Sequence, residues 1–245
     1  MNTTNNTVLI TGGSAGIGFE TAKQFIARVN KVIIAGRNAE RLQKAAAQIP
    51  DAIAIQADVT NKEDVAKLVK TIKTNHPDLN MLINNAGSAF VYTLGGESDA
   101  YSKATSEIDT NYLSIVNLTE QLLPILRTKA DAAIVNVSSI VAFAPSAVLP
   151  TYTASKAALH AYTKTLRYTL KDTSIKVFEL MPPLVDTEFS AEIGGHNGIK
   201  PSVVASELIE ALERDNYEIH VGDTAAIYQL SLKSPQEALL AMNNR

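Results

Sequence analysis

VLITGGSAGIG, residues 8–18, joins a short apolar run to a turn with glycines at positions 12, 16 and 18. Helix-like sequence begins directly after the turn. The pattern predicts a buried strand, a tight turn and a helix whose first N–H groups are free. Free N–H groups and the positive end of a helix dipole favour an anion, and glycines let a diphosphate approach the backbone. This stretch therefore favours a bound nucleotide.

The same stretch also contains a different motif. Gly12, Ser14 and Gly16 spell G-x-S-x-G, the turn that carries the nucleophile of serine hydrolases. That turn normally follows several strands of an open sheet, whereas here it follows the first strand. A hydrolase with Ser14 as its nucleophile stays as an alternative, and so does a Rossmann protein that senses a nucleotide without catalysis.

The composition limits the class of protein. The 245 residues contain no Pro/Gly/Ser-rich linker and 46% are hydrophobic, so we expect one domain over residues 1–245. The N-terminal MNTTNNT lacks the basic start and apolar core of a secretion signal. No apolar run approaches the roughly 20 residues that span a bilayer. We therefore expect a cytoplasmic protein with no membrane partner.

The residue types also argue against several chemistries. Cysteine is absent, which excludes disulfides and thiolate catalysis and agrees with a reducing compartment. The four histidines are scattered without the spacing of metal ligands, so we expect no metal site. Lys and Arg number 22 against 25 for Asp and Glu, with no basic tract, so we expect no nucleic-acid partner.

Short apolar segments alternate with helix-like segments along the chain. Strands are expected at residues 31–35, 52–56, 81–83, 132–137, 175–180 and 218–221, and helices at residues 19–27, 38–48, 60–75, 104–129, 152–170 and 202–214. Continuous apolar strands separated by helices require a parallel sheet covered on both faces. The predicted fold class is α/β: a Rossmann-like, doubly wound parallel sheet of about seven strands with helices on both faces.

Two features predict where helices begin or break. Thr60 and Glu63 have the spacing of a capping box, which predicts the start of the third helix. Pro124 predicts a kink or a boundary in the helical segment 104–129, because proline lacks the N–H that a helix needs.

Polar residues follow two later strands at their carboxyl ends, where open α/β sheets bind their ligands. Asn84–Gly87 follow the fourth strand, and Ser139 follows the fifth. Tyr152 comes 13 residues after Ser139, and Lys156 comes four residues later, on the same helix face. The glycine turn, the Asn84–Gly87 strand end and the Ser, Tyr, Lys set therefore converge on one site.

These motifs together resemble the short-chain dehydrogenase/reductase family in its single-domain form, from Val8 to about Thr187. The family's T-G-x-x-x-G-x-G is Thr11–Gly18, its N-N-A-G is Asn84–Gly87, and its Y-x-x-x-K runs from Tyr152 to Lys156. Its other matching residues are listed here: Ser139, the helix asparagine Asn111, and Asp58 beside the adenine. The resemblance implies an NAD(P)-dependent oxidoreductase that transfers a hydride between a nicotinamide cofactor and a carbonyl/alcohol substrate.

The chemistry explains why the family uses these residue types. A tyrosine with a pKa of about 10 is a poor base at neutral pH, so the ammonium group of Lys156 is needed to favour the phenolate. Tyr152 can then exchange a proton with the substrate oxygen, while Ser139 hydrogen-bonds the same oxygen. The resemblance implies that Lys156 also reaches the ribose hydroxyls and that Asn111 holds a water. Ser139, Tyr152, Lys156 and Asn111 are the expected catalytic set.

Each motif contributes residues to the expected cofactor site. They are Thr11, Gly12, Ser14, Gly16, Ile17, Gly18, Arg37, Asp58, Val59, Asn85, Ala86, Gly87, Tyr152, Lys156 and Thr187. An Asp or Glu about 20 residues beyond the glycines would bind the ribose hydroxyls and repel a 2′-phosphate. That position is Gly36 here, and the neighbouring Arg37 can bind phosphate oxygens. We therefore expect NADP, with NAD as the alternative.

The substrate side is predicted to be mostly apolar. We expect a substrate loop at about residues 183–200, with Thr187 near the nicotinamide carboxamide. The other residues expected there are Phe90, Val91, Tyr92, Val141, Phe143, Leu149, Leu184 and Phe189. No arginine stands among them to hold a carboxylate or phosphate. The expected substrate is an uncharged, moderately hydrophobic carbonyl or alcohol.

Some positions depart from the family or lie outside its motifs. Val29 stands where relatives often have the glycine that closes the first helix, so we expect that turn to be built differently. Pro183 replaces the glycine of the family's Pro-Gly. Residues 222–245 match nothing in the family and are expected to serve packing or an oligomer contact. Alanines in the helix after Tyr152, together with the resemblance, predict a homodimer or homotetramer.

Overall fold

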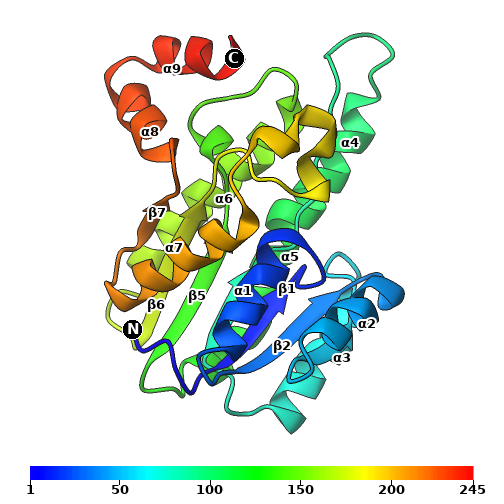
Figure 1. Cartoon of the computed structure of the whole chain (residues 1–245), viewed down its shortest axis with the longest axis vertical. Helices are drawn as coiled ribbons and strands as arrows, with labels where there is room; N and C mark the ends of the chain where they lie inside the picture. The colour runs from blue at the N-terminus through cyan, green and yellow to red at the C-terminus, as the bar shows by residue number, and fades with distance from the viewer. Residues whose placement is uncertain (245) are drawn as a thin grey trace.

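A parallel sheet forms the centre of the molecule (Figure 1). The computed structural model describes residues 1–244, and its sheet contains seven parallel strands in the order β3-β2-β1-β4-β5-β6-β7. The strands are β1 Thr7–Thr11, β2 Lys31–Gly36, β3 Ile53–Gln56, β4 Met81–Asn84, β5 Ala132–Val137, β6 Ile175–Met181 and β7 Glu218–His220. The order reverses direction between β1 and β4, which is where doubly wound sheets bind their ligands.

Helices cover both faces of this sheet. The longer helices are α1 Gly16–Ile26, α2 Ala39–Gln48, α3 Lys62–Asn75, α4 Ala100–Ile108, α5 Ser114–Leu126, α6 Pro150–Thr169, α7 Pro201–Glu213, α8 Thr224–Lys233 and α9 Pro235–Asn243. Short helical turns are η1 Asp109–Leu113, η2 Ile140–Ala142, η3 Glu188–Ile193 and η4 Gly195–Asn197.

The core divides into two layers because successive strand residues point to opposite faces. Val8 and Ile10 of β1 pack with α1, α2 and α7, whereas Leu9 packs with α3, α5 and α6. All five residues of β1 are buried, so the strand is apolar on both sides. The predicted α/β fold, with a Rossmann-like parallel sheet covered on both faces, is confirmed.

The turn after α1 is not built in the expected way. Val29 itself adopts the left-handed conformation, with φ of 59°, that a glycine would normally take. The Asn30 N–H then bonds the Phe25 carbonyl, which closes the helix in the usual manner. The expectation of a different turn is therefore wrong, because the backbone keeps the turn and a β-branched side chain tolerates the strain.

Two other local predictions also need correction. The side chain that caps α3 is Asn61, which accepts from the N–H groups of Glu63 and Asp64, and not Thr60. Thr60 instead donates its hydroxyl to Asp58. Pro124 lies in the last turn of α5, where it neither ends nor separates a helix. The irregular point is the π-turn η1, where the Ser114 N–H bonds the Asp109 carbonyl five residues back.

The C-terminal helices pack on the segment that follows β5. The Ala147 N–H donates to Asn243 Oδ1 at 2.6 Å, and Asn243 Nδ2 donates to the Pro145 carbonyl at 2.8 Å. Residues 222–244 thus serve packing, as expected, and Arg245 lies outside the described residues. Among residues 1–244, none of the helices is both long and apolar enough to cross a lipid bilayer.

Candidate active site

The glycine turn between β1 and α1 leaves helix N–H groups free. Gly12 and Gly16 adopt left-handed conformations, with φ of 65° and 54°. Ala15, the N-cap of α1, offers no side-chain acceptor, and the first turn of α1 has no acidic residue. The unpaired N–H groups at this helix start are therefore suited to an anion such as a diphosphate.

Other residues of the motif hold the turn from beneath. The N–H groups of Asn85 and Ala86 donate to Thr11 Oγ1 at 3.0 and 3.1 Å. Asn85 Nδ2 donates to the carbonyls of Thr11 and Gly12 at 3.0 and 3.1 Å. A Cβ atom at Gly18 would lie 2.5 Å from Asn85 Nδ2, so only glycine fits there. Thr11, Gly18 and Asn85 thus fix the turn against the end of β4.

A groove runs from the glycine turn across the ends of β2 and β3. Its walls are Gly12, Ser14, Ala35, Gly36, Arg37, Asn38, Arg41, Ala57, Asp58, Val59, Ala86, Gly87 and Thr110. The groove thus brings together the predicted Gly12, Ser14, Arg37, Asp58, Val59, Ala86 and Gly87. No histidine among the described residues lines this groove, so Ser14 has no nearby base of the kind that a hydrolase needs.

Arg41 is a groove residue that the sequence motifs did not predict. It lies in the first turn of α2, whose N-cap Asn38 accepts from the Arg41 N–H. Its guanidinium forms an ion pair with Glu188 of η3, 147 residues away in the chain. The signal that could have revealed Arg41 is its position in the first turn of the helix that begins just after β2 and Arg37.

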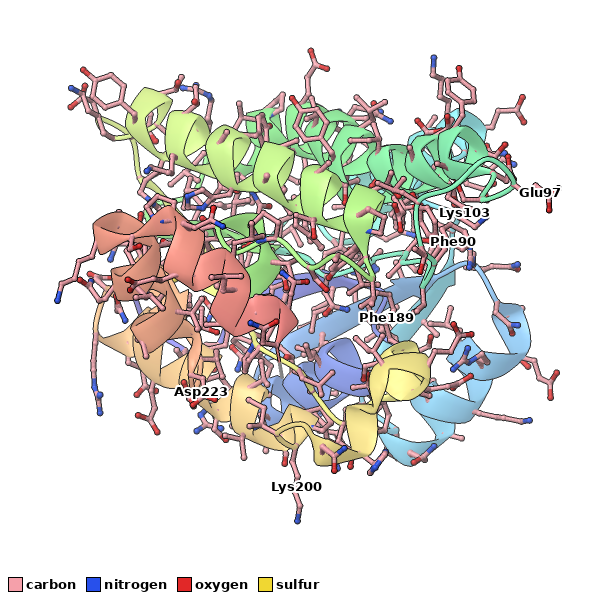
Figure 2. The ribbon with its side chains drawn as sticks, turned by 90° about the horizontal axis from the view of Figure 1, so that it is seen from above. Phe90, Glu97, Lys103, Phe189, Lys200 and Asp223 are labelled. Carbon is pink, nitrogen blue, oxygen red and sulfur yellow. The ribbon has the colours of Figure 1, made fainter. Side chains whose placement is uncertain are left out.

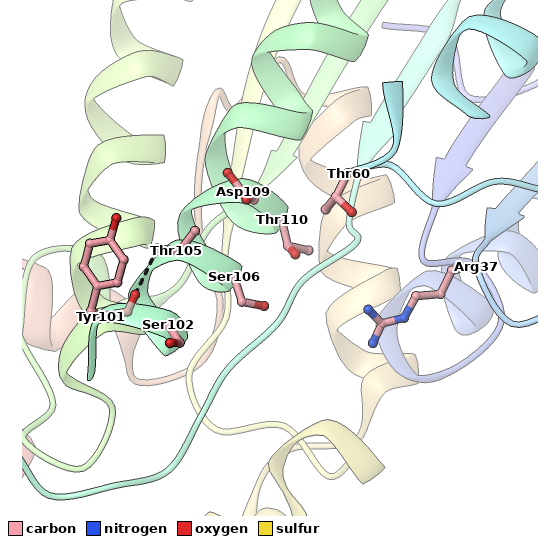
Figure 3. Close-up of a pocket in the computed structure, with 8 residues that line it drawn as sticks. All are labelled: Arg37, Thr60, Tyr101, Ser102, Thr105, Ser106, Asp109 and Thr110. Atoms are coloured by element: carbon pink, nitrogen blue, oxygen red, sulfur yellow. Dashed lines mark hydrogen bonds between the residues drawn. The ribbon is translucent and has the colours of Figure 1, made fainter. Parts of the chain in front are cut away.

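Arg37 also borders a second, polar hollow between the turn after β3 and α4 (Figure 3). The other lining residues are Thr60, Tyr101, Ser102, Thr105, Ser106, Asp109 and Thr110. Asp58 lies two residues before Thr60 in the turn after β3. Its carboxylate accepts hydrogen bonds from the Thr60 N–H at 2.9 Å and from the Thr60 hydroxyl at 2.7 Å. The Arg37 guanidinium thus faces open polar surroundings, as a phosphate-binding cation requires.

The predicted catalytic residues meet at the other end of the groove. Ser139 caps η2 directly after β5, and Tyr152 and Lys156 lie one turn apart on α6. Lys156 Nζ lies 5.6 Å from the centre of the Tyr152 ring and donates to the Val137 carbonyl at 2.8 Å. A Cβ atom at Gly87 would lie 4.0 Å from Lys156 Nζ, so the catalytic set adjoins the groove.

Burial shifts the protonation of the two central groups. Tyr152 and Lys156 are 8% and 3% exposed. Burial raises the pKa of Tyr152, a hydrogen bond from Ser139 opposes this rise, and the nearby charge of Glu107 adds to it. Burial lowers the pKa of Lys156 to about 8, against the opposing charge of Glu179. In this state Tyr152 is a protonated acid, suited to proton donation.

Asn111 lies in the π-turn η1, and its side chain joins two other segments. Its Oδ1 accepts from the Ser88 N–H at 2.8 Å, and its Nδ2 donates to the Ser88 carbonyl at 2.8 Å and to Ser155 Oγ at 2.9 Å. The amide therefore fixes the segment after β4 to α6. These contacts use both amide hydrogens and one lone pair of Oδ1, and the predicted water at Asn111 stays a prediction.

Glu107, one turn before Asn111, also binds the segment after β4. The sequence motifs did not predict this residue. Its Oε1 accepts from the Phe90 N–H at 2.8 Å, while Oε2 is buried without a well-formed hydrogen bond. Burial raises the pKa of Glu107, and the nearby Thr151 hydroxyl and Phe90 N–H oppose this rise. Asn111 and Glu107 together hold the Ser88–Phe90 segment beside Tyr152.

The substrate side is built from chain segments that lie far apart in sequence. Tyr152 belongs to an apolar cluster whose buried members are Ile140, Val141, Ala144, Leu149, Ile227 and Ala238. Phe189 of η3 lies 6.1 Å from Tyr152 between ring centres, and Thr187 contacts the Gly16 position. Figure 2, which looks onto the carboxyl ends of the strands, shows Phe90 after β4 and Phe189 on η3.

Comparison with known proteins agrees with this geometry. The family model for short chain dehydrogenases matches residues 6–198. The uncharacterized oxidoreductase DltE of Bacillus subtilis is 41% identical over 207 residues, which cover 84% of this chain and 82% of that protein. Serine 3-dehydrogenase of Agrobacterium fabrum is 34% identical over 194 residues, which cover 79% of this chain and 77% of that protein.

A solved structure extends the likeness to nearly the whole chain. A short chain dehydrogenase from Burkholderia cenocepacia, in complex with NADP, has a TM-score of 0.88 and 25% identity, and the match covers 99% of each chain. The protein belongs to the short-chain dehydrogenase family. It is therefore an NAD(P)-dependent oxidoreductase, and this class is favoured over the serine hydrolase and over the non-catalytic nucleotide sensor.

Proposed function

We propose that this protein transfers a hydride between NADP(H) and an uncharged, moderately hydrophobic carbonyl/alcohol pair. The observation that carries the proposal is the position of Ser139, Tyr152 and Lys156 at the end of the nucleotide groove, beside Gly87. A substrate oxygen held between Ser139 and Tyr152 would thus lie next to a cofactor extending along the groove.

The chain's own residues supply the acid–base chemistry. Tyr152, kept protonated by burial, donates its proton to the carbonyl oxygen, while the Ser139 hydroxyl hydrogen-bonds the same oxygen. The ammonium group of Lys156 stabilises the phenolate that forms. A water held by Asn111 would return the proton from solvent. When bound, the nicotinamide supplies or accepts the hydride.

The groove residues fit the parts of the cofactor. The free N–H groups of the Gly12–Gly16 turn would hold the diphosphate, and Ile17 follows in the first turn of α1. Asp58 and Val59 would contact the adenine, and Lys156 the ribose hydroxyls. Thr187, which contacts the Gly16 position, would bond the carboxamide.

Two cations favour NADP over NAD. Gly36 leaves no carboxylate to repel a 2′-phosphate, and both Arg37 and Arg41 line that end of the groove. The glycine turn has Ala15 and supplies no basic residue at that position, and Arg41 is the second cation of the groove. Its ion pair with Glu188 would compete with a phosphate for the same guanidinium.

The walls around Tyr152 favour an uncharged substrate. Ile140, Val141 and Leu149 are buried there, and Phe189 lies across the tyrosine ring. Apolar walls make it costly to bring in a carboxylate or ammonium without a partner. The Agrobacterium relative is named for serine, which carries both charges, so we propose a different substrate for this chain.

We also propose one cytoplasmic domain over residues 1–245, with a substrate loop at about 183–200, that forms a homodimer or homotetramer. Ala154 and Ala161 are exposed on the outer face of α6, and Leu113 beside α5 is 47% exposed. Small exposed residues allow two helices to approach closely. Light scattering that showed a monomer at micromolar concentration would contradict the oligomer.

A panel assay tests the proposed reaction. Purified protein is mixed with NADPH or NADH and a series of aldehydes and ketones, and the loss of reduced-cofactor absorbance is followed. We expect turnover of uncharged compounds, faster with NADPH, and little with carboxylated ones. Ester cleavage that Ser14→Ala abolishes would contradict this function, whereas only weaker cofactor binding is expected of that variant.

A further inference from the structure

A buried carboxylate lies behind the catalytic residues and takes no part in the reaction proposed above. Glu179 of β6 is 0% exposed. Its Oε1 accepts a hydrogen bond from the Ser138 hydroxyl, and its Oε2 lies 2.9 Å from His160 Nδ1. A buried carboxylate is costly unless hydrogen bonds and an opposite charge compensate it. The two contacts fix the position of the carboxylate, so its negative charge acts on the cations around it.

Two different elements connect Lys156 to this carboxylate. On β5, the Val137 carbonyl accepts from Lys156 Nζ, and the next residue, Ser138, bonds Glu179. On α6, His160 lies one turn after Lys156 on the same helix face and contacts the same carboxylate. Through Ser138 on the strand and His160 on the helix, Glu179 is thus linked to a lysine that is only 3% exposed.

We infer that Glu179 is a positioning residue of the proposed reaction, whose fixed negative charge keeps Lys156 in the ammonium form that Tyr152 needs. The inference rests on the proposed function for its meaning in catalysis. Its structural basis is that Glu179 contacts Ser138, one residue after the Val137 carbonyl that Lys156 bonds, and His160, one turn after Lys156.

The other ionisable groups around this pair do not replace Glu179. On α6 these are Tyr152, which is held protonated by burial, and His160. On β7, burial lowers the pKa of His220, and Glu218 is paired with Arg167 at 3.2 Å. On α4, Glu107 acts on Tyr152. Glu179 is the carboxylate that acts on Lys156, opposing the loss of its proton on burial.

The test measures the lysine directly, without cofactor or substrate. The protein is labelled with ¹³C,¹⁵N-lysine, the Lys156 signals are assigned from their loss in Lys156→Arg, and their pH titration is followed by NMR. We expect Glu179→Gln to lower the pKa of Lys156, which means an acid dissociation constant at least about tenfold larger. The reason is that the variant removes an opposite charge that favours the ammonium form. Glu218→Gln, which removes a carboxylate from the neighbouring strand, is the matched control and should change this constant less than threefold.

An unchanged Lys156 titration in folded Glu179→Gln would overturn the inference, and so would an equal shift in Glu218→Gln. If Glu179→Gln does not fold, the double variant Lys156→Met/Glu179→Gln decides the matter. Removing both charges should restore a cooperative urea transition, because neither charge is then left unpaired. A double variant that stays unfolded would contradict the pairing. Since no turnover is measured, failure of the proposed reaction would leave the Lys156 titration as it is.

Discussion

The two ends of the groove are built by different means. At the nucleotide end, the turn of Gly12 to Gly18 and the end of β4 present backbone N–H groups, and their hydrogen bonds join the ends of two adjacent strands. At the substrate end, side chains from the segment after β4, from η2, α6, η3, α8 and α9 meet around Tyr152. A site built from backbone N–H groups needs short motifs with glycines at fixed positions. A site built from side chains needs only apolar residues that fill the space.

This difference teaches where each function can vary. Substitution at Gly12 or Gly18 meets neighbouring atoms within 3 Å, so the nucleotide end admits few sequences. The substrate wall carries exposed and half-buried side chains, such as Phe189 at 54%, that can be exchanged without loss of the fold. The packing therefore constrains the residue type more tightly at the cofactor end than at the substrate end.

The largest expected effect separates chemistry from nucleotide binding. Tyr152→Phe removes the proton donor but keeps the ring packing, so turnover should fall about 10²–10⁴-fold while the Kd for NADPH stays within twofold. Steady-state kinetics and fluorescence titration of NADPH measure the two quantities. Turnover that stayed near the wild-type rate would show that the proton comes from another group.

A smaller effect is expected at the nucleotide end and tests which cofactor it selects. Arg37→Ala should weaken NADPH binding roughly five- to a hundredfold, because a partly exposed phosphate–guanidinium contact contributes on the order of 1–3 kcal/mol. NADH binding should hardly change. Isothermal titration with both cofactors measures the difference.

Arg41→Ala is the companion variant for the same end. It should also weaken NADPH selectively, but less than Arg37→Ala, because Glu188 already occupies part of its guanidinium. Arg28→Ala, at a half-buried position in the turn after α1, is the control. Equal losses for NADPH and NADH in both groove variants would mean that the arginines support the loop and not the phosphate.

The pH dependence of stability tests the substrate end without substrate. The pKa of Lys156 is about 8 in the folded protein, below the value of about 10.4 for an exposed lysine. Between these values the unfolded chain binds a proton that the folded chain has released, so folding stability should rise as pH increases. We expect a gain of about 1–2 kcal/mol from pH 8 to 9.5 relative to Lys156→Met.

Urea unfolding at each pH measures this gain. The comparison stays below pH 10 because the raised pKa of Tyr152 acts in the opposite sense above that value: the unfolded tyrosine then ionises while the folded one does not. Parallel pH profiles for the wild type and Lys156→Met would show that Lys156 does not titrate in this range.

The smallest expected effect lies at the far end of α1, away from both sites. Val29 is 75% exposed and has a left-handed backbone, so its side chain contributes little packing and costs strain. Val29→Gly should raise the free energy of unfolding by about 0.5–1 kcal/mol, since relief of strain exceeds the extra entropy of an unfolded glycine. Val29→Ala keeps the Cβ atom and should gain much less. Equal midpoints for all three proteins would refute the strain.

Local sequence was enough for most of the fold and for the glycine turn between β1 and α1. The strand boundaries were predicted to within two residues, because apolar runs between helices leave a parallel sheet as the consistent arrangement. Local prediction failed where a nearby residue offered an alternative. Asn61 caps α3 in place of Thr60. The helical segment is interrupted by the π-turn at Asn111 and not by Pro124. Such choices differ by about 1 kcal/mol, which a spacing pattern cannot resolve.

The sequence by itself determined the doubly wound sheet, the glycine turn and the Tyr152–Lys156 pair, because each is encoded by residues within a few positions of one another. Only the tertiary structure decided that Arg41 meets Glu188, that Asn111 holds Ser88 and Ser155, and that Glu179 meets Ser138 and His160. These contacts join segments that are 19 to 147 residues apart at the closest and farthest. They depend on how helices pack across the sheet, and no local pattern carries that information.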